Sequence, residues 1–311
     1  MDRLTNLYTA LTSLPQLTLL RNEVMSRHTT FRTGGPAAIW AQPETADALI
    51  EALRLAREHG VEPVLLGAGS NVLAPDEGLD TLVLQLKGMA TASAEGNVLT
   101  AEAGISLRRL AVLAQQQGLT GLEFAHGIPG TLGGAIYMNA GAYGGEMKDV
   151  ITCVTALLPD GTLRELCCEE LDFGYRHSAM LSMNAVALSA KLTLQPGDPE
   201  VIAARMAELQ AKRTASQPLE YPSAGSTFKR PTTGYAAAMI DETGLKGLSV
   251  GGAQVSEKHA GFVINRGDAT TEDILALMQQ VQQRVFDRTG VLLEPEVRIL
   301  PRYKGGVLWN S

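Results

Sequence analysis

The sequence is poor in cysteine, with only Cys153, Cys167 and Cys168 among its 311 residues. An odd number of cysteines cannot form a complete disulfide framework, so a small disulfide-stabilised secreted fold is excluded and a reducing compartment is expected. Cys167 and Cys168 are adjacent, and no other Cys or His stands at ligand spacing from them. We therefore interpret both as ordinary strand residues and expect no metal site in the chain.

Basic residues are also few. The chain has 26 Lys and Arg against 33 Asp and Glu, which gives a net charge of −7 with neutral histidines. This balance argues against a broad basic surface that binds nucleic acid, so no nucleic-acid partner is expected. Small anionic ligands are compatible with it, because a few local cations and backbone N–H groups suffice to bind them.

Long apolar runs are missing. No stretch of about 18 apolar residues occurs, so no membrane-spanning helix is expected. Near the N-terminus, the apolar run 11–20 is interrupted by Thr12, Ser13, Pro15 and Gln16, and no small-residue cleavage pattern follows a basic start. The sequence therefore predicts no signal peptide, no membrane insertion and a cytoplasmic location.

Glycine, in contrast, is abundant. The chain has 32 glycines, about one residue in ten, against a usual share of about 7%. They follow no three-residue period, so a collagen-like chain is excluded. With 45% hydrophobic and 19% charged residues, the chain is expected to bury a core and to fold.

Helix-like and strand-like segments alternate along the chain. The breaker-rich segment 195–199 offers the best domain boundary, with a strand-rich part before it and strong helices after it. Helical periodicity predicts helices at 44–59, 106–117, 200–213 and 271–289. Short apolar or alternating runs predict strands at 64–66, 81–86, 98–103, 151–158, 162–168, 185–194 and 297–300. The turn Pro159-Asp-Gly161 predicts that 151–158 and 162–168 form a β-hairpin.

The first candidate site is the segment Gly67-Ala-Gly-Ser-Asn71, which follows an expected strand. It is not a Rossmann fingerprint, because Val72 stands at the third glycine position and a strand follows, and it lacks the Lys-Ser/Thr pair of a P-loop. Gly67 and Gly69 allow positive φ, so that consecutive N–H groups can converge on an anion. Taken alone, the segment is somewhat more typical of a tight turn between strands.

The second candidate site, Gly127–Gly145, is denser and has seven glycines in 19 residues. A loop with so few side chains exposes backbone to a ligand that approaches closely, and a planar cofactor with a pyrophosphate fits this description. Thr131 and Asn139 are available for polar contacts. A merely mobile loop fits poorly, because its apolar residues favour burial, namely Ile128, Pro129, Leu132, Ile136 and Met138.

Six short motifs, in order along nearly the whole chain, resemble the UDP-N-acetylenolpyruvoylglucosamine reductase family of bacterial cell-wall enzymes. They are His28–Pro36, Gly67–Leu73, Gly127–Gly134, Tyr175–Ser178, Gly225–Lys229 and Glu294–Arg298. Each motif is weak alone, but six ordered matches are specific. The 50 residues that separate Arg176 from Ser226 resemble the shorter, type II branch, which lacks an inserted loop over the substrate.

This resemblance implies an α+β fold. The expected FAD-binding region, residues 1–197, has the vanillyl-alcohol-oxidase/PCMH type of fold in two subdomains, at about 1–70 and 71–197. A C-terminal α+β substrate-binding domain is expected at 198–298. Residues 299–311 then form a tail that can pack back on the FAD region.

The resemblance also implies the cofactors and the reaction. FAD is expected to be held non-covalently, without attachment to His28 or His126, and NADPH is the expected reductant. The substrate is the enolpyruvyl ether of UDP-N-acetylglucosamine, which is reduced to UDP-N-acetylmuramate in peptidoglycan precursor synthesis by a monomer or weak oligomer. The expected FAD contacts are Gly67, Ala68, Gly69, Ser70, Asn71, Gly127, Ile128, Pro129, Gly130, Thr131, Gly133, Gly134 and Asn139.

Three residues carry the expected catalytic roles. Arg176 is expected to hold the substrate carboxylate, Ser226 to protonate C2, and Glu296 to assist as a protonated carboxylic acid or through a water. A serine hydroxyl is too weak an acid alone, so a neighbouring cation is expected, with Lys229 as the candidate. Each residue by itself would be unremarkable, and only its place in a matched motif supports the role.

Weaker predictions concern the substrate. Tyr175, Lys229, Lys258 and His259 are candidate substrate contacts, although a core tyrosine or a cationic surface turn would look the same. Two other functions stay open at this point. One is an oxidase of the same flavin fold acting on an alcohol or sugar, and the other is a non-catalytic nucleotide-binding or regulatory protein.

Overall fold

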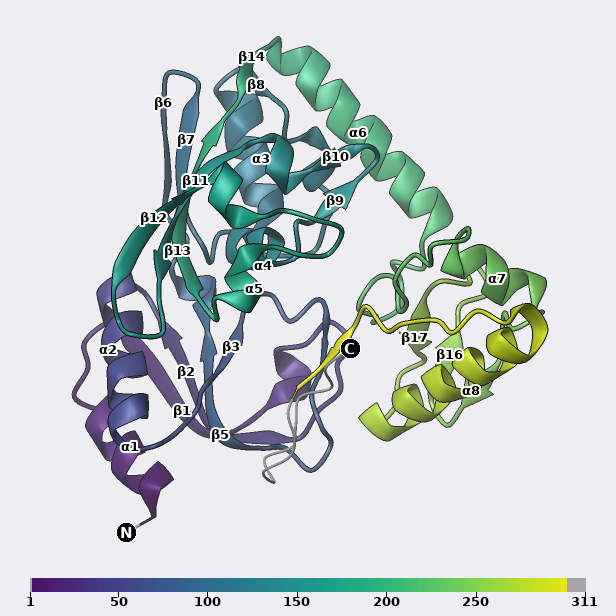
Figure 1. Cartoon of the computed structure of the whole chain (residues 1–311), viewed down its shortest axis with the longest axis horizontal. Coiled ribbons are helices and arrows are strands. Elements are labelled where there is room, and N and C mark those ends of the chain that lie inside the picture. Colours follow the sequence, from purple (N-terminus) through teal and green to yellow (C-terminus); the bar gives the residue numbers. More distant parts are fainter. Residues whose placement is uncertain (1, 301–311) are drawn as a thin grey trace. The chain divides into compact units, whose positions relative to one another are not determined.

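The computed structural model describes residues 2–300, which divide into two compact units (Figure 1). Unit 1 runs to Leu20 and continues with Trp40–Ala68 and Leu82–Arg213. Unit 2 consists of Arg21–Ile39, Gly69–Thr81 and the described residues from Thr214 onward. Most of the expected C-terminal tail, from residue 301 on, lies outside the described residues.

Helices and strands are mixed along the chain, as expected for an α+β protein. The described α-helices are α1 (Arg3–Leu11), α2 (Ala46–Glu58), α3 (Leu107–Gln116), α4 (Leu132–Tyr137), α5 (Ala179–Ser182), α6 (Pro199–Ser216), α7 (Ala236–Glu242) and α8 (Thr271–Thr289). The described strands are β1 (Leu17–Val24), β2 (Pro36–Pro43), β3 (Val64–Leu66), β4 (Val72–Leu73), β5 (Leu79–Gln85), β6 (Ala92–Glu95), β7 (Val98–Glu102), β8 (Leu119–Thr120), β9 (Gly141–Ala142), β10 (Gly145–Glu146), β11 (Ile151–Leu157), β12 (Leu163–Cys167), β13 (Val186–Thr193), β14 (Gln195–Pro196), β15 (Ser249–Val250), β16 (Ala253–Val255), β17 (Val263–Asn265) and β18 (Arg298–Ile299).

An antiparallel sheet in the order β12-β11-β13-β7-β6 forms much of unit 1. The predicted hairpin is confirmed, with Val154 opposite Leu166 on its buried face. Helix α3 packs into the same core through Leu107 and Leu110, and the Ser106 hydroxyl accepts from the Arg109 N–H at 3.2 Å to cap its first turn. A further sheet has the order β1-β2-β5-β3, with β3 and β5 parallel.

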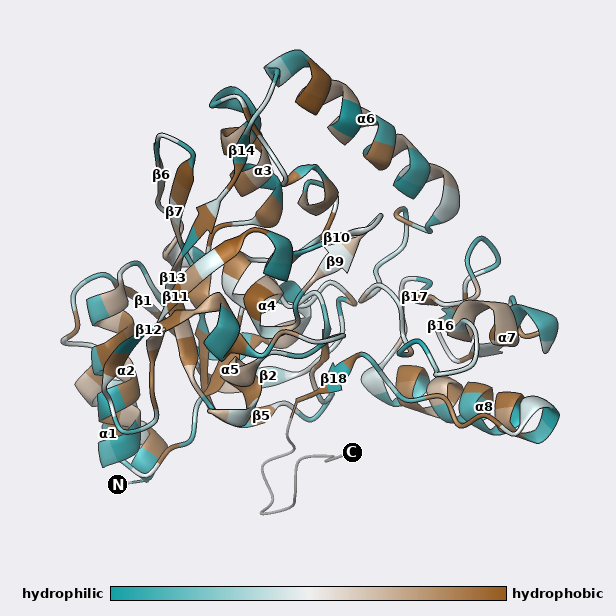
Figure 2. Ribbon diagram, turned by 45° about the horizontal axis from the view of Figure 1, so that its top comes forward, coloured by the Kyte–Doolittle hydropathy of each residue, from teal (hydrophilic) through white to brown (hydrophobic). Residues whose placement is uncertain are grey.

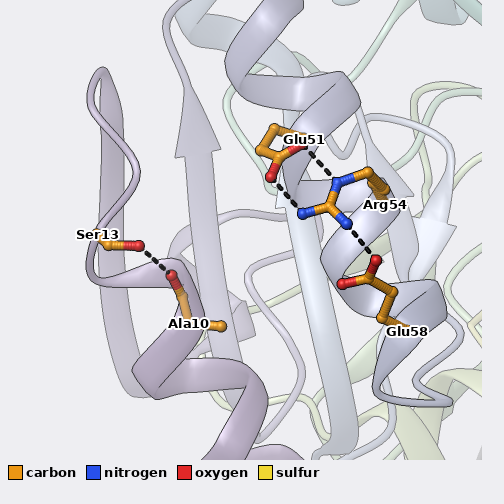
Figure 3. A network of polar contacts seen from close by, with 5 residues as sticks. All are labelled: Ala10, Ser13, Glu51, Arg54 and Glu58. Atoms are coloured by element: carbon orange, nitrogen blue, oxygen red, sulfur yellow. Dashed lines mark hydrogen bonds and ion pairs between the residues drawn. The ribbon is translucent and has the colours of Figure 1, made fainter.

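Helix α2 has the predicted apolar face and a charged outer surface. On the exposed side, the Arg54 guanidinium donates to Glu51 at 2.6 and 2.7 Å and also pairs with Glu58 (Figure 3). At the end of α1, the Ser13 hydroxyl donates to the Ala10 carbonyl oxygen at 2.8 Å. These surface contacts are local to the helices and do not involve the predicted site.

Helix α8 organises unit 2. Its predicted apolar face, including Ile274, Leu277 and Val281, is buried against the sheet β15-β16-β17, and Figure 2 shows brown and teal alternating along the helix. The helix begins with a capping box between Thr270 and Asp273 and ends at Gly290, whose φ of 72° suits glycine. Both ends are therefore those that the sequence predicts.

The glycine-rich segment Gly127–Gly145 differs from the prediction of a loop. Residues 132–137 form helix α4, and β9 and β10 form a short hairpin after it. Leu132 and Ile136 are fully buried, as expected, whereas Pro129 is exposed. Burial of the apolar side of α4 compensates for the low helix propensity of Gly133 and Gly134.

The division into units does not follow the expected domain limits. The chain passes from unit 1 to unit 2 between Arg213 and Thr214, within α6, whereas the breaker-rich segment at 195–199 lies before that helix. The expected limits near residues 70 and 197 stay a prediction, because compact units defined by contacts need not coincide with domains.

Candidate active site

The first glycine segment lies between β3 and β4. A Cβ on Gly69, whose φ is +67°, would lie 2.0 Å from the carbonyl oxygen of His28, so no other residue fits there without rearrangement. The Thr30 N–H donates to the Gly69 carbonyl at 2.9 Å. The His28–Pro36 motif and the Gly67–Leu73 motif are thus packed together.

The same segment also meets the second glycine segment. A Cβ on Gly67 would lie 2.4 Å from Oγ1 of Thr131, and the buried Gln85 side chain donates to the Gly67 carbonyl at 3.1 Å. Two segments predicted to hold one cofactor are therefore brought into contact within unit 1.

The first glycine segment, Gly67–Asn71, offers backbone N–H groups as hydrogen-bond donors. Among the described residues, the N–H groups of Ala68, Gly69 and Ser70 find no hydrogen-bond acceptor. Consecutive unpaired amides form the kind of site that binds an anionic phosphate group. Together with the bare backbone at Gly67 and Gly69, they fit the pyrophosphate of a dinucleotide cofactor such as FAD.

The second glycine segment uses its glycines in different ways. The N–H groups of Leu132 and Gly133 donate to Ile105 and Ala103 at 2.9 and 2.8 Å, and a Cβ on Gly133 would lie 2.9 Å from the Ala103 Cβ. Gly134 is exposed, and the nearest atom to its Cβ would be 3.5 Å away. The protein itself therefore leaves too little room for a Cβ at 133 but accommodates one at 134 in ordinary van der Waals contact.

Gly127 is approached by α6. The Arg213 guanidinium donates to the Gly127 carbonyl through Nη1, and a Cβ on Gly127 would lie 3.1 Å from Oε1 of Gln210. Burial lowers the pKa of Arg213 below its ordinary value, and the Tyr143 hydroxyl partly opposes this effect. Arg213 thus fixes the start of the second glycine segment, a role that its sequence context did not reveal.

Arg176, the expected carboxylate-binding residue, lies in unit 1 on a tight turn. Gly174 and His177 exchange backbone hydrogen bonds of 3.0 and 3.3 Å, so that Tyr175 and Arg176 form the tip. Arg176 has a φ of +54°, and its guanidinium lies 5.4 Å from the centre of the exposed Tyr175 ring. A left-handed arginine is uncommon and requires support from its surroundings.

Ser226 and Glu296 both lie in unit 2, on segments that run side by side. The Glu296 N–H donates to the Thr227 carbonyl at 2.8 Å, and Phe228 and Pro295 form an isolated antiparallel bridge. The Asn71 side chain of the first glycine segment donates to the Glu296 carbonyl at 3.1 Å. The motifs that carry Asn71, Ser226 and Glu296 are therefore brought together, as three predicted parts of one site require.

Thr227 is a residue of this site that sequence reasoning missed. It is fully buried, its N–H donates to the Gly261 carbonyl at 2.8 Å, and its hydroxyl accepts from the Val263 N–H at 3.0 Å. It thereby fixes the backbone next to Ser226. A polar residue directly before the apolar Phe228 was the only signal in the sequence.

The weaker substrate candidates have protein partners. Lys229 forms an ion pair of 3.1 Å with Glu294, which lowers its value as a helper of Ser226. The Lys258 ammonium donates to the Thr214 carbonyl at 2.7 Å. Nδ1 of His259 accepts from the Gly261 N–H at 3.2 Å, and burial lowers the pKa of that histidine. Their substrate contacts, and that of Tyr175, stay predictions.

Two further properties concern residues 2–300 as a group. Within this range no cluster of His, Cys, Asp and Glu side chains is placed to hold a metal ion. Nor does any helix there have the length and apolar character needed to cross a membrane.

Comparison with known proteins identifies the class first. Residues 37–166 match the family described as FAD binding domain, and residues 217–300 match the family described as UDP-N-acetylenolpyruvoylglucosamine reductase, C-terminal domain. An FAD-binding region followed by a reductase domain defines a flavin-dependent oxidoreductase. The predicted α+β fold class with an FAD-binding region is confirmed, and its assignment to the vanillyl-alcohol-oxidase/PCMH type stays a prediction.

Whole-chain relatives identify the family. UDP-N-acetylenolpyruvoylglucosamine reductase of Agathobacter rectalis is 46% identical and aligns over 93% of this chain and 96% of its own length. The enzyme of that name from Alkaliphilus oremlandii is also 46% identical, over 96% and 99%. The crystal structure of the Thermus caldophilus reductase superposes with a TM-score of 0.79 at 36% identity, over 92% and 99%. The chain belongs to the UDP-N-acetylenolpyruvoylglucosamine reductase family.

Proposed function

We propose that this enzyme reduces the enolpyruvyl ether of UDP-N-acetylglucosamine to UDP-N-acetylmuramate, with NADPH as reductant, in peptidoglycan precursor synthesis. Family membership supports the reaction, since the relatives carry its name. The structural observation that carries the proposal is the hydrogen-bonded ladder from Asn71 through Glu296 to Thr227, beside Ser226. It joins a cofactor-binding segment to two of the proposed catalytic segments.

The cofactor fits the residues that are present. The unpaired N–H groups of Ala68, Gly69 and Ser70 would hold the pyrophosphate of FAD, and the open backbone at Gly134 would allow close approach. When bound, FAD would supply hydride transfer from NADPH to the terminal vinyl carbon of the substrate.

The remaining chemistry falls to side chains. Hydride addition leaves negative charge on C2 of the substrate and on its carboxylate, so a fixed cation stabilises the transition state. Arg176 suits this task, because its planar guanidinium keeps its charge and can bind a carboxylate through two hydrogen bonds. Ser226 donates the proton to C2, and Glu296 in its acid form can donate a hydrogen bond to the developing charge.

The test separates the two half-reactions by stopped-flow absorbance. With Ser226→Ala, flavin reduction by NADPH should be unchanged, while reoxidation by the enolpyruvyl nucleotide should slow by about 100- to 10,000-fold. Ser223→Ala, three residues earlier on the same segment, is the matched control and should behave as wild type. Slowing of the NADPH step alone would contradict the role of Ser226.

The same measurement discriminates the other functions. An oxidase would be reoxidised rapidly by oxygen, with no effect of the nucleotide. A non-catalytic binding protein would show no turnover that Ser226→Ala could change. Comparison of NADPH with NADH as reductant tests the proposed nucleotide preference.

A further inference from the structure

The backbone conformation of Arg176 depends on the turn from Gly174 to His177. Gly174 and His177 close the turn through their mutual hydrogen bonds, and Arg176 occupies the left-handed region with a φ of +54°. Such a conformation costs free energy for a residue with a side chain, so neighbouring groups must hold it. The structure shows which groups do so on each side of the turn.

On one side the support comes from Asn139, which follows α4. Its Nδ2 donates to the Gly174 carbonyl at 3.1 Å and to Oε2 of Glu146 at 2.7 Å, while its Oδ1 accepts from the Lys148 N–H at 3.0 Å. The residue is only 2% exposed. Its side-chain amide is thus committed to protein partners.

The other side of the turn is fixed to the same segment. The hydroxyl of Ser178, which is fully buried, donates to the Tyr137 carbonyl at 3.0 Å. Both flanks of the Arg176 turn are therefore attached to the last turn of α4 and the residues that follow it.

We propose that Asn139 is a positioning residue for Arg176 rather than a direct contact to the cofactor. The inference rests on the proposed function, because it assigns Arg176 the substrate carboxylate. Asparagine suits the position for two reasons: its own φ of 42° lies in the left-handed region that Asn tolerates well, and the site needs an acceptor and two donors on one short side chain.

Asn139→Asp and Asn139→Gly test the proposal in the FAD-containing enzyme. Aspartate keeps the acceptor for Lys148 but cannot donate to Gly174, whereas glycine keeps the backbone conformation and adds no charge beside Glu146. Flavin reoxidation by the enolpyruvyl nucleotide should slow by about 10- to 100-fold, because a displacement of about 1 Å can cost that much. Flavin reduction by NADPH and FAD content should be unchanged.

Asn184→Asp is the matched control. Asn184 also lies in unit 1 and has a left-handed φ of 49°, but it is exposed, and its side chain makes no hydrogen bond within residues 2–300. This variant should keep both half-reactions at the wild-type rate. Equal slowing in the Asn184 and Asn139 variants would overturn the proposal.

A double-mutant comparison distinguishes positioning from general damage. If Asn139 acts through Arg176, adding Asn139→Gly to Arg176→Ala should slow reoxidation little beyond Arg176→Ala alone. Fully multiplicative effects of the two substitutions would overturn the inference. Loss of FAD or slower flavin reduction in the Asn139 variants would instead support a direct cofactor contact and also overturn it.

Hydrogen exchange tests the structural role of Asn139 independently of the proposed reaction. The amides of Gly174 and His177 should exchange faster in both Asn139 variants than in wild type, whatever substrate the enzyme uses. Unchanged exchange would overturn the inference. Failure of the wild-type enzyme to be reoxidised by the enolpyruvyl nucleotide, with exchange still faster in the variants, would refute the proposed function alone.

Discussion

The side-chain amide of Asn71 donates to the backbone carbonyl of Glu296, with 3.1 Å between Nδ2 and the oxygen. The Arg298 N–H in turn donates to the Asn71 carbonyl at 3.0 Å, and β4 and β18 pair in parallel beyond it. A residue of the first glycine segment therefore fixes the backbone of a proposed catalytic residue 225 positions away.

Asn71→Ala should reveal two effects of this hydrogen bond, one on the stability of the folded protein and one on the rate of the reaction. Loss of the hydrogen bond should lower the free energy of unfolding by about 1 kcal/mol. Glu296 should then shift, and flavin reoxidation by the enolpyruvyl nucleotide should slow by about tenfold or more. Urea unfolding and stopped-flow absorbance measure the two effects.

Asn97→Ala is the control for Asn71→Ala. The Asn97 side chain donates to the Leu194 carbonyl at the same 3.1 Å, in unit 1. Asn97→Ala should lower the free energy of unfolding by a similar amount and leave the rates of both half-reactions unchanged. An equal kinetic effect of the two substitutions would show that the Asn71 contact has no special relation to catalysis.

Gly67→Ala should destabilise the enzyme, because the added Cβ would clash with one atom, the hydroxyl oxygen of Thr131. The added Cβ would lie 2.4 Å from Oγ1 of Thr131, whereas the Thr131 Cβ and Cγ2 would be 3.7 and 3.8 Å away. Overpacking of this kind costs about 1–3 kcal/mol in the free energy of unfolding. Adding Thr131→Ala removes the clashing oxygen and should recover most of the loss in urea unfolding; a double variant no better than Gly67→Ala would refute this account.

Gly134→Ala should give the opposite result. An added Cβ would be in ordinary contact at 3.5 Å from Oγ1 of Thr131, and alanine in a helix interior stabilises the helix by about 0.5–1 kcal/mol relative to glycine. The apoprotein should therefore be as stable as wild type or more so, while FAD binding should weaken by tenfold or more because the Cβ occupies the cofactor's space. Gly134→Ser should weaken it further. Titration of apoprotein with FAD measures this, and unchanged affinity would show that FAD does not lie against Gly134.

The sequence predicted those helices and strands whose periodicity and end signals lie within the segment itself. Helix α8 is an example, because its apolar period, the capping box at Thr270 and the stop at Gly290 all lie within the helix and its neighbours. Helix α4 was missed, because Gly133 and Gly134 oppose helix formation. Its stability comes from contacts that the sequence does not show, such as the Leu132 N–H donating to Ile105.

The sequence predicted which motifs belong to the site, but not which of their residues contact one another in space. Ser226, Glu296 and Asn71 were singled out separately, yet no sequence pattern indicates that the Asn71 amide meets the Glu296 backbone or that Thr227 lies between. Pairing of two-residue parallel strands such as β4 and β18 depends on the whole fold. Asn139 was expected to contact FAD, and only the structure shows its amide directed to Gly174.

His259 should make stability depend on pH in the acid range. Burial, followed by the smaller effect of Lys246, lowers its pKa below the ordinary value of about 6.5, so the unfolded chain binds a proton more readily than the folded protein does. This contribution to stability is complete above about pH 6.5 and is lost as the pH falls below it. His259→Gln cannot be protonated, so its free energy of unfolding should fall less steeply between about pH 6.5 and 5 than that of wild type. The slope difference, measured by urea unfolding at several pH values, cannot exceed about 1.4 kcal/mol per pH unit for one proton, and identical slopes would refute the prediction.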